Sequence, residues 1–477
     1  MLRRDFLKNL SISLGGMALA AHLPLGVFAG DKRTVKGVVS AKGKGLAGVV
    51  VSDGYTVMPT DEKGRFEFVA HKDAVNVFVA TPAGYHFLQE TGITRNYEAL
   101  SDNGAYNFEL TPLDKDDNEH HFFVWADTQV KNKKDVKKLM TQTVPSMKNS
   151  IAALPSGALA HGITLGDIAW DDLAYFDDYS KAVGEIGLPF FQCWGNHDMD
   201  FNKGGEATSD DTFMKVFGPT YYSFNRGKVH YIVMDNVRYL GVDRNYDGYV
   251  LEHQLEWLKK DLSFVPQENL IVLCMHIPLF SHTLNAQDVL ALLGKRKVHV
   301  MSGHTHYNEN TEHGNVYEHN HGTVCGAWWT GPICGDGTPN GYAVYHVNGT
   351  DISWQYISTG KPANHQMKIW ISEPLSDMRI LQVNIWNFDA AWKTEYFVDG
   401  VSKGTLERYM GYDPDAYATL LGPEKPASRG FAEPHLNDHM FRANIPVNAG
   451  VVKVVVTDRF GNVYTAEKAV EKVKVAA

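Results

Sequence analysis

Five short apolar runs between residues 121 and 306 each end in a side chain that can bind a metal ion or carry a proton. They cover residues 122–127, 163–167, 190–197, 271–276 and 298–306, with helical stretches between them. This alternation is typical of an α/β layered domain. Buried strands need apolar residues along their length, and polar side chains at their carboxyl ends converge on one edge. The pattern therefore predicts both the fold class and the place of a site.

The segments on either side of this pattern are predicted to be β structure. Residues 48–54 and 60–68 alternate apolar and polar side chains across a turn. This region resembles the small transthyretin-like or carboxypeptidase-regulatory β-sandwich modules. Near the other end, residues 451–456 form an apolar run followed by a turn. We expect a β-sandwich-like module over 31–113, an α/β (α+β layered) domain over 119–360 and a C-terminal β-rich module over 361–477.

The polar residues at the ends of the five runs fall into short motifs. In chain order these are Asp127-Thr128-Gln129, Gly166-Asp167, Gly195-Asn196-His197-Asp198, His276, and Gly303-His304-Thr305-His306. The order resembles the calcineurin-like metallophosphoesterase family, whose pattern is DxH, GD, GNH followed by an acid, a single His, and GHxH. Any one fragment occurs by chance, but all of them in this order at strand ends are specific. The resemblance implies a metallophosphoesterase β-sandwich flanked by helices.

The resemblance also implies a centre with two metal ions. Two cations about 4 Å apart can hold a phosphate, polarise its phosphorus and ionise a bridging water. Holding them so close requires a shared anionic ligand, a position that the family pattern gives to Asp167. The remaining ligands that the pattern assigns are Asp127, Gln129 and His306 for the first ion, and Asn196, His276 and His304 for the second. Mixed nitrogen and oxygen ligands favour Fe, Mn or Zn over Mg or Ca.

The residues after Asn196 are expected to handle the proton. In the family, the position of His197 faces the leaving-group oxygen, so His197 is the expected proton donor. We expect Asp198 to hold the orientation of its imidazole, a common role for a carboxylate beside a catalytic histidine. The reaction implied is in-line attack of metal-bound hydroxide on phosphorus, without a covalent enzyme intermediate.

Two departures from related patterns bear on the metals. The family most often has His where this chain has Gln129, whose neutral amide oxygen is a poorer ligand. Some members carry Gln there, so activity stays the favoured interpretation, although the affinity of the first ion is affected. Purple acid phosphatases place a tyrosine ligand three residues after the bridging Asp, where this chain has Trp170. A tyrosinate–iron centre is therefore not expected.

The first thirty residues resemble an export signal. Arg3-Arg4-Asp5-Phe6-Leu7-Lys8 is similar to the twin-arginine motif, a small apolar region follows over 10–21, and 27–29 is a plausible cleavage site. The alternative is a membrane anchor, but the apolar run is shorter than the ~20 residues that a spanning helix needs. We expect residues 1–30 to be removed and the mature protein, without a transmembrane helix, to be periplasmic or extracellular.

The net charge and the cysteine content limit which classes of function and metal site the chain can have. The net charge is −10, which argues against a nucleic-acid-binding surface because phosphate backbones attract basic proteins. It leaves phosphate esters open as substrates, because bound cations reverse the local charge. The chain has four cysteines and no CxxC metal pattern. Cys325 and Cys334 could pair after export, but their spacing fixes no geometry.

Weaker patterns have plain structural interpretations. Residues 243–248 match the first half of an EF-hand loop, but the twelfth position is Gln254 rather than Glu, so we predict a turn. His313, His319 and His321 are interpreted as histidines at the surface or behind the ligands. Asp171 and Asp172 could either tune the site or cap a helix.

Two aromatic pairs could line a substrate cleft. Trp328-Trp329 and Tyr221-Tyr222 are candidates because exposed rings stack on sugars or bases, although packing in the core explains them equally well.

The sequence therefore predicts an exported phosphohydrolase that cleaves a phosphomonoester or phosphodiester. The alternative from another class is a non-catalytic surface protein that binds glycans or proteins and keeps a decayed metal site. The presence of His197 beside almost every metal position argues against it. A metallohydrolase acting on another ester fits the GNHD and GHTH motifs poorly. Nothing in the sequence separates nucleotides, sugar phosphates, lipid headgroups or polymers as substrates.

Overall fold

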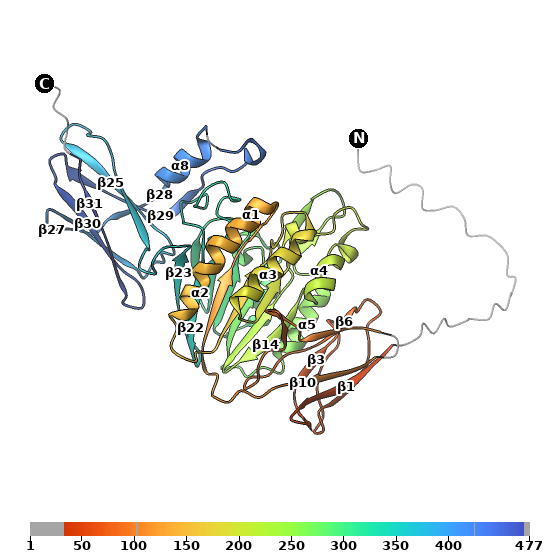
Figure 1. Cartoon of the computed structure of the whole chain (residues 1–477). Helices are drawn as coiled ribbons and strands as arrows, with labels where there is room; N and C mark the ends of the chain where they lie inside the picture. Colours follow the sequence, from red (N-terminus) through yellow and green to blue (C-terminus); the bar gives the residue numbers. More distant parts are fainter. Residues whose placement is uncertain (1–32, 102–103, 424, 472–477) are drawn as a thin grey trace, which may run out of the picture.

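The computed structural model describes residues 33–101, 104–423 and 425–471 and contains three units (Figure 1). The predicted export signal lies outside the described residues. The central unit, residues 119–358, lies between an N-terminal and a C-terminal β module. The fold class predicted from the apolar runs is confirmed, a mixed α/β unit with β-rich units at both ends. Among the described residues, no helix has the length and apolar character needed to cross a bilayer.

The N-terminal module packs two small sheets face to face. Its strands are β1 (Thr34–Ala41), β2 (Lys44–Gly45), β5 (Arg65–Val69) and β10 (Ala105–Glu109) in one sheet, and β3 (Val50–Ser52), β4 (Val57–Pro59), β6 (Asn76–Val79) and β9 (Tyr97–Ala99) in the other. Val39, Val51, Phe66 and Val77 meet between them and are almost fully buried. The alternation of apolar and polar residues places these side chains inward.

Two sheets form the middle of the central unit. The first has the order β23-β22-β11-β12-β13-β8-β7, with β7 (Gln89–Glu90), β8 (Ile93–Thr94), β11 (Glu119–Trp125), β12 (Ala160–Leu165), β13 (Phe190–Cys193), β22 (Gly341–Asn348) and β23 (Asp351–Ser358). The second has the order β14-β15-β18-β19-β21-β20, with β14 (Tyr222–Arg226), β15 (Val229–Val233), β18 (Leu270–Cys274), β19 (Val298–Ser302), β20 (Glu309–His313) and β21 (Val316–Asn320).

Helices cover the outer faces of these sheets (Figure 1). They are α1 (Lys133–Lys138), α2 (Val144–Ala152), α3 (Phe176–Ile186), α4 (Asp211–Phe217), α5 (Glu252–Leu262), α6 (Leu279–His282) and α7 (Ala286–Leu293), and a π-helical turn joins α1 to α2. Along β11, Phe122 and Val124 pack into the core shared with the second sheet, and Phe123 and Trp125 pack into the core shared with α2 and α3. Both faces of β11 are buried, which explains its uninterrupted apolar sequence.

The N-terminal module and the central unit share a sheet. Strands β7 and β8 come from within residues 31–113, yet β8 pairs in parallel with β13, with Ile93 opposite Phe190. The N-terminal module therefore extends the edge of the first central sheet. Covering a sheet edge in this way removes unpaired backbone groups that could pair with another chain.

The C-terminal module is a second β-sandwich. Its sheets contain β24 (Met367–Ile371), β25 (Met378–Ile385), β28 (Glu407–Tyr412) and β29 (Leu436–Pro446), and β26 (Lys393–Val398), β27 (Val401–Gly404), β30 (Val451–Thr457) and β31 (Val463–Ala469). The predicted strand at 451–456 is β30. Between β28 and β29, helix α8 (Pro414–Leu421) and the segment after it extend toward the central unit (Figure 1).

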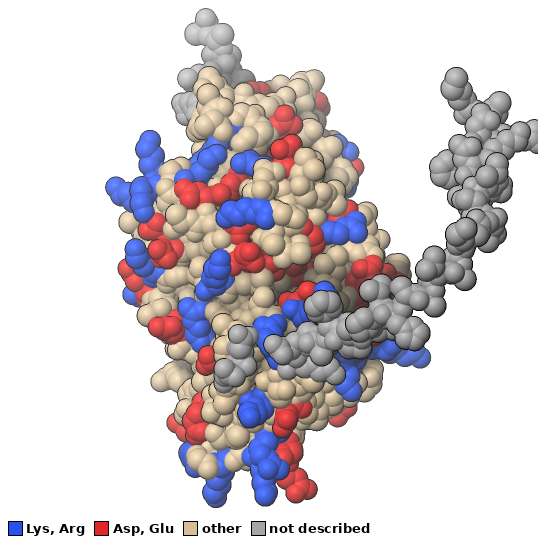
Figure 2. All heavy atoms as spheres, turned by 90° about the vertical axis from the view of Figure 1, so that its right-hand side faces the viewer, with Lys and Arg blue, Asp and Glu red and all other residues tan. Residues whose placement is uncertain are grey.

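The surface has mixed charge on the face shown in Figure 2. Lys and Arg side chains are interspersed there with Asp and Glu side chains. A short hairpin of β16 (Val237–Tyr239) and β17 (Tyr246–Gly248) occupies the segment that resembles half an EF-hand. The carboxylate of Asp247 accepts two hydrogen bonds from Arg238, at 2.9 and 2.6 Å. This segment is therefore strand and turn, and Arg238 neutralises one of its acidic groups.

Candidate metal centre

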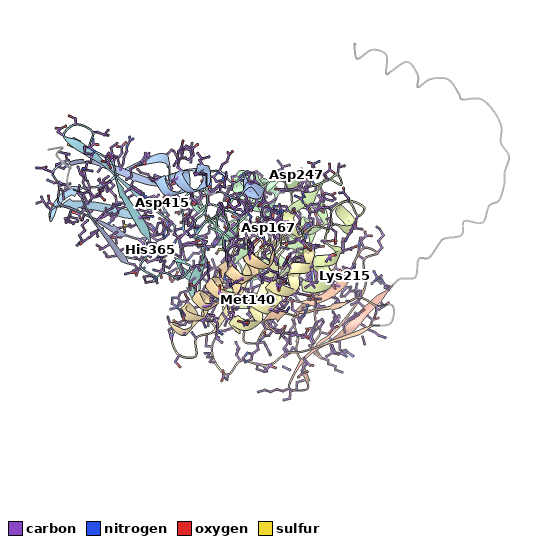
Figure 3. All side chains as sticks on the ribbon, turned by 45° about the horizontal axis from the view of Figure 1, so that its top comes forward. Met140, Asp167, Lys215, Asp247, His365 and Asp415 are labelled. Atoms are coloured by element: carbon purple, nitrogen blue, oxygen red, sulfur yellow. The ribbon has the colours of Figure 1, made fainter. Side chains whose placement is uncertain are left out.

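The polar strand-end residues meet at one edge of the two sheets. Asp127 follows β11, Asp167 follows β12 and Asn196 follows β13, three strands that run parallel. His276 follows β18, and His304 and His306 follow the parallel neighbour β19. Figure 3 labels Asp167 near the middle of the central unit. The carboxyl ends of parallel strands lie at one edge, which explains why residues distant in sequence converge.

Several of these residues have an unusual backbone conformation. The φ angles of Asp127, Gln129, Asp167, His304 and His306 are +47°, +36°, +50°, +73° and +58°. Non-glycine residues rarely adopt positive φ, and holding one there costs about 1–3 kcal/mol. Such conformations are retained where the surrounding structure imposes them, commonly at functional sites. Their concentration here is independent of side-chain chemistry and supports a functional centre.

One set of ligands surrounds His276. Its Nε2 atom lies 3.0 Å from Asn196 Oδ1, 3.2 Å from Asp167 Oδ1 and 3.2 Å from His304 Nδ1. Its Nδ1 atom lies 2.7 Å from the carbonyl oxygen of Leu165, a contact that fixes the ring and directs Nε2 into the centre. The nitrogen and oxygen ligand atoms of Asp167, His276 and His304 come within 4.8 Å of one another. This spacing fits one cation.

The second set is marked by polar atoms that lack partners. Asp127 Oδ1, Gln129 Oε1 and His306 Nε2 are buried and form no hydrogen bond within the described residues. Asp127 Oδ1 lies 3.5 Å from His306 Nε2, and the other nitrogen of His306 lies 2.7 Å from the carbonyl oxygen of Gly326. An unpaired buried polar atom costs about 1–3 kcal/mol. A cation accepting these three ligands removes that cost, so the residues fit a metal.

Asp167 lies between the two sets. Its Oδ1 atom is next to His276, and its Oδ2 atom accepts a 2.6 Å hydrogen bond from the Gln129 side-chain amide. Gln129 thus directs its nitrogen to the shared carboxylate and leaves its oxygen free for the first set. All seven residues predicted as metal ligands are brought together, with Asp167 in the position expected of a bridging ligand.

Burial and mutual charge separate the pKa values of the acidic groups. Burial raises the pKa of Asp127 to about 7, with a contribution from the neighbouring carboxylate of Asp167 and against the opposing effect of His276. Burial would also raise the pKa of Asp167, but His276 and His197 outweigh it and lower the pKa. Asp167 is therefore the carboxylate that stays ionised most readily, as a bridging ligand must.

The pKa values of the histidines in the centre also differ from one another. Burial lowers the pKa of His306 to about 4, although the carbonyl oxygen of Gly326 opposes this. Burial and the nearby His276 lower the pKa of His304 well below its usual value. For His276, burial is outweighed by Asp167, and the pKa rises to about 9. His304 and His306 are therefore neutral at pH 7 and ready to coordinate, whereas a cation must displace a proton from His276.

The predicted proton donor has a different partner from the one expected. His197 Nδ1 lies 2.7 Å from Asp171 Oδ1, and the other oxygen of Asp171 pairs with Arg244 at 2.7 Å. Burial would lower the pKa of His197, but the carboxylates of Asp167 and Asp171 raise it. The backbone N–H of His197 donates to Asp167 Oδ1 at 2.9 Å. These contacts place His197 next to the bridging carboxylate.

Asp198 does not contact this imidazole, which corrects the expectation from the sequence. Its carboxylate accepts hydrogen bonds from the backbone N–H groups of Ile168, Ala169 and Gly195, at 3.0–3.1 Å. It therefore ties the β12 loop to the β13 loop. The sequence leaves two roles open for Asp171, tuning the site or capping a helix, and no motif in it pairs Asp171 with His197. Asp172 caps the turn Leu173–Tyr175, because its side chain accepts a hydrogen bond from the backbone N–H of Ala174.

Aromatic side chains from two units border the centre. The Trp328 ring stacks on His306 with centroids 4.2 Å apart, and Trp170 lies edge-on to His197 at 6.1 Å. Phe431, from the segment after α8, contacts both indoles at 5.0 and 5.5 Å. The nearby guanidinium of Arg429 forms a buried 2.7 Å ion pair with Asp135. The sequence named Trp328 as a candidate, but no local pattern pointed to Phe431 or Arg429.

The remaining candidates lie in the core or elsewhere. Trp329 and Tyr222 are buried, and Tyr221 lines a different cavity. His319 and His321 are buried in contacts with His299 and Tyr345, so they are core residues rather than surface histidines. The four cysteines all belong to the described residues and are buried thiols without a disulfide. Cys325 Sγ lies 3.6 Å from His306 Nδ1.

Comparison with known proteins identifies the flanking regions. A family model described as the N terminal of calcineurin-like phosphoesterase matches residues 33–113, and one described as the C terminal of calcineurin-like phosphoesterase matches residues 318–464. The second match begins inside the central unit, at β21, and includes β22 and β23. No curated protein matches the chain.

Among solved structures, several proteins show low-identity similarity to parts of this chain. A purple acid phosphatase from yellow lupin (Lupinus luteus) seeds is 13% identical, with a TM-score of 0.32, over 56% of this chain and 51% of that one. A 5'-nucleotidase from Candida albicans is 13% identical, with a TM-score of 0.32, over 51% of both chains. The phosphopantetheinyl hydrolase from Mycobacterium tuberculosis is 14% identical, with a TM-score of 0.29, over 43% and 91%. This chain thus spans about half the length of the first two.

Proposed function

Because the chain belongs to the calcineurin-like phosphoesterases, metal-dependent hydrolases, we propose that it cleaves a phosphomonoester or phosphodiester at the strand-end centre with two metal ions. The observation that carries this proposal is the pair of ligand sets on either side of Asp167. One set has three buried ligand atoms without hydrogen-bond partners, and the other converges on His276.

The chain's own residues define where the ions bind. Asp127, Gln129 and His306 would hold one ion, and Asn196, His276 and His304 the other, with Asp167 shared. Ions held there would supply Lewis acidity to a phosphate oxygen and to an attacking water. Iron, manganese or zinc suits this mixture of nitrogen and oxygen ligands. Each of these residues follows a buried strand, so the two sheets restrict where its ligand atoms can lie.

His197 is proposed to donate a proton to the leaving-group oxygen. Asp171 accepts a hydrogen bond from its Nδ1–H, which leaves Nε2 as the atom that faces the substrate. The carboxylates of Asp167 and Asp171 raise the pKa of this imidazole and favour its protonated, donating form. Arg244 holds the second oxygen of Asp171 and so keeps that carboxylate in place.

The aromatic side chains bordering His197 are proposed to contact the leaving group. Trp170 lies beside the imidazole, and Phe431, about half exposed, covers Trp170 and Trp328. Aromatic faces stack on flat or apolar rings, so a leaving group with a ring fits this side of the centre. The C-terminal module would then contribute to substrate choice through Phe431.

Export is part of the proposal. The twin-arginine-like segment at residues 3–8 and the apolar region after it support translocation to the periplasm or the exterior. The twin-arginine route carries folded proteins, so a metal centre could be assembled before export.

The test combines metal analysis with hydrolysis of p-nitrophenyl phosphate and bis-p-nitrophenyl phosphate. We expect about two transition-metal ions per chain and turnover of at least one ester. Asp167→Asn should lose both metal and turnover, because it weakens the shared ligand. The matched control is Asp177→Asn, which changes an exposed carboxylate on α3.

The alternative is a binding protein with a decayed metal site, for which Gln129 is the supporting departure. One metal ion or none, with no turnover after manganese or zinc is added, would favour that alternative. Near-native activity of Asp167→Asn would contradict the two-metal proposal directly.

A further inference from the structure

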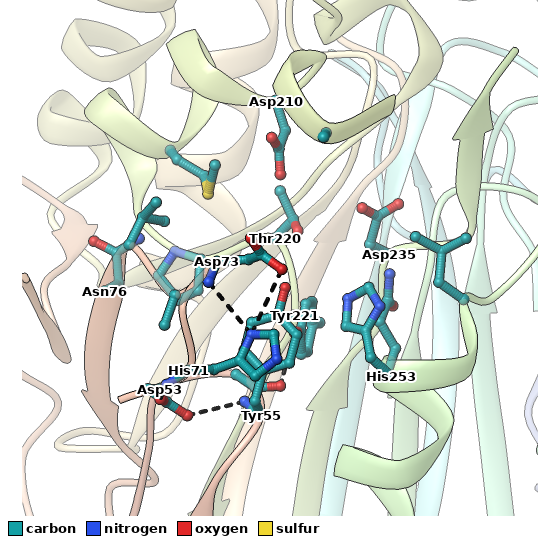
Figure 4. A pocket seen from close by; sticks show the side chains of 18 of the residues that line it. Asp53, Tyr55, His71, Asp73, Asn76, Asp210, Thr220, Tyr221, Asp235 and His253 are labelled. Atoms are coloured by element: carbon teal, nitrogen blue, oxygen red, sulfur yellow. Dashed lines mark hydrogen bonds and ion pairs between the residues drawn. The ribbon is translucent and has the colours of Figure 1, made fainter. Parts of the chain in front are cut away.

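A second cavity lies between the N-terminal module and the central unit, apart from the metal centre. Its volume is about 640 Å³, within the range of small-molecule sites, and none of the described residues that line it is a candidate metal ligand. Tyr55 and His71 of the N-terminal module border one side, and Asp210, Asp235 and His253 of the central unit border the other (Figure 4).

The cavity is acidic. Its lining contains six carboxylates and, among the described residues, neither Lys nor Arg; the carboxylates are those of Asp53, Asp73, Glu206, Asp210, Asp211 and Asp235. Asp235 is only 5% exposed. Burying several like charges without a cation is unfavourable. Burial, together with repulsion from the neighbouring acids, accordingly raises the pKa of Asp210 to about 7 and the pKa of Asp235 well above its usual value.

A buried side-chain amide is an independent observation that points to a binding site. Gln254, in the first turn of α5, lines the cavity and is 2% exposed. Its Oε1 atom has no hydrogen-bond partner within the described residues. Buried amide oxygens are almost always paired, so this atom is available to a donor group in the cavity. Together with the carboxylates, it makes the lining rich in acceptors.

Aromatic rings complete the lining. Tyr55 stacks on His71 with centroids 3.9 Å apart and on His253 at 5.0 Å, and Tyr221 lies 5.8 Å from His253. The hydroxyl of Tyr221 donates to the carbonyl oxygen of Gly54 at 2.7 Å, which joins the two units beside the cavity. Rings next to carboxylates are the combination that recognises organic cations.

The spacing of the acids distinguishes an organic cation from a metal ion. Among the described residues, His, Cys, Asp and Glu ligand atoms converge within 4.8 Å only at Asp167, His276 and His304. The carboxylates of the cavity are therefore spread around its wall rather than gathered at one point. We propose that this cavity binds a small organic ammonium compound, with the ammonium group near Asp210 and Asp235 and the Gln254 oxygen accepting from a donor group.

Calorimetric titration of the full-length protein with tyramine tests this proposal. Tyrosol, which carries a hydroxyl in place of the amine, is the neutral control ligand. We expect tyramine to bind and tyrosol to bind at least tenfold more weakly. Asp210→Asn and Asp235→Asn should each weaken tyramine binding at least tenfold, because each removes a carboxylate that gives up its proton when an ammonium group binds beside it. Asp177→Asn, away from the cavity, should leave it unchanged.

Several results would overturn the proposal. These are no tyramine binding, equal binding of tyramine and tyrosol, or unchanged affinity in both cavity variants. Binding of manganese that competes with tyramine would show a metal site instead. If Asp235→Asn lowers the thermal midpoint, Asp210→Asn decides the outcome, because Asp210 is less buried and its side chain does not cap α4. Binding is measured without turnover, so this result does not depend on the hydrolase function.

Discussion

At the residue scale, the position of His197 relative to Asp171 decides how the proposed proton donor would work. Asp171 is the carboxylate that contacts its ring, and Asp198 instead holds three backbone N–H groups. Asp198 follows His197 directly in the chain, but the tight turn after β13 directs its side chain away from the imidazole. Adjacent residues in a turn rarely point to the same place.

Asp171→Asn should therefore weaken proton donation. Without the carboxylate, the pKa of His197 falls and its ring is less firmly oriented, so turnover of esters with poor leaving groups should drop about tenfold, a part of what a general acid contributes. Good leaving groups such as p-nitrophenol should be affected much less. His197→Ala should show the same dependence more strongly, and Asp172→Asn serves as the control. Equal slowing for good and poor leaving groups would contradict the acid role.

Substitutions of Gln129 test whether its side chain binds the first metal ion. Its free Oε1 atom joins Asp127 and His306 in the set of unpartnered ligand atoms. Gln129→Ala should leave about one metal ion per chain after dialysis, since the first ion loses a ligand while the second keeps its own. Gln129→His restores the residue common in the family and should hold both ions at least as tightly. Unchanged metal content in Gln129→Ala would show that the amide does not coordinate.

At the element scale, glycines let the strand ends come close enough for the candidate metal ligands to meet. A Cβ atom on Gly195 would lie 2.1 Å from the backbone nitrogen of Asp167 and 2.4 Å from its Oδ1 atom. One on Gly303 would lie 2.6 Å from Asp127 Oδ2. The glycines of the GNH and GHxH motifs are therefore needed because neighbouring strands bring ligands against their backbones.

Gly195→Ala should displace the bridging carboxylate. The contacted atoms are backbone and ligand atoms rather than a flexible side-chain end, so relief requires the β12 or β13 loop to move. We expect metal content to fall well below that of the wild type while circular dichroism stays native. Gly187→Ala, at the left-handed residue (φ +81°) that ends α3, is the comparison for a loss of stability without a loss of metal, because a Cβ there meets no neighbouring atom within 4 Å but strains the backbone. Full metal content in Gly195→Ala would contradict this account.

At the scale of the whole molecule, the C-terminal module is bound to the central unit through a buried polar network. Asp336 is fully buried, and its carboxylate lies 3.1 Å from His439 Nε2. Its carbonyl oxygen accepts from the side-chain amides of Asn384 and Asn437, at 2.8 and 3.1 Å. The Arg429–Asp135 pair adds a second buried link. These contacts indicate that the two units unfold together.

His439→Ala should strongly destabilise the protein. It leaves Asp336 buried beside a cavity and without its basic partner, and breaking a buried pair in this way costs about 3–5 kcal/mol. Urea unfolding should show a lower midpoint, and the transition could separate into two as the units uncouple. His86→Ala, at an exposed position of the N-terminal module, is the matched control. A loss of stability no greater than that of His86→Ala would mean that the network contributes little.

The layered α/β class and the metal-ligand candidates can both be predicted from the amino-acid sequence. Both depend on local patterns. Buried strands are apolar along their length, the polar residues at their ends meet at one edge, and the order of the motifs there resembles that of a known family. The glycines and the GNHD and GHTH motifs are equally local. The alternating runs of the β modules are local patterns too, so these modules can be predicted without knowledge of how they pack.

The contacts between residues from distant segments become apparent in the folded chain. It assigned His197 to Asp171, brought Phe431 and Arg429 from the C-terminal module to the centre, and inserted β8 beside β13. It also formed the acidic cavity from two units whose sequences show no shared motif. Contacts between segments far apart in sequence depend on how whole units pack, and no periodicity within a single segment encodes them.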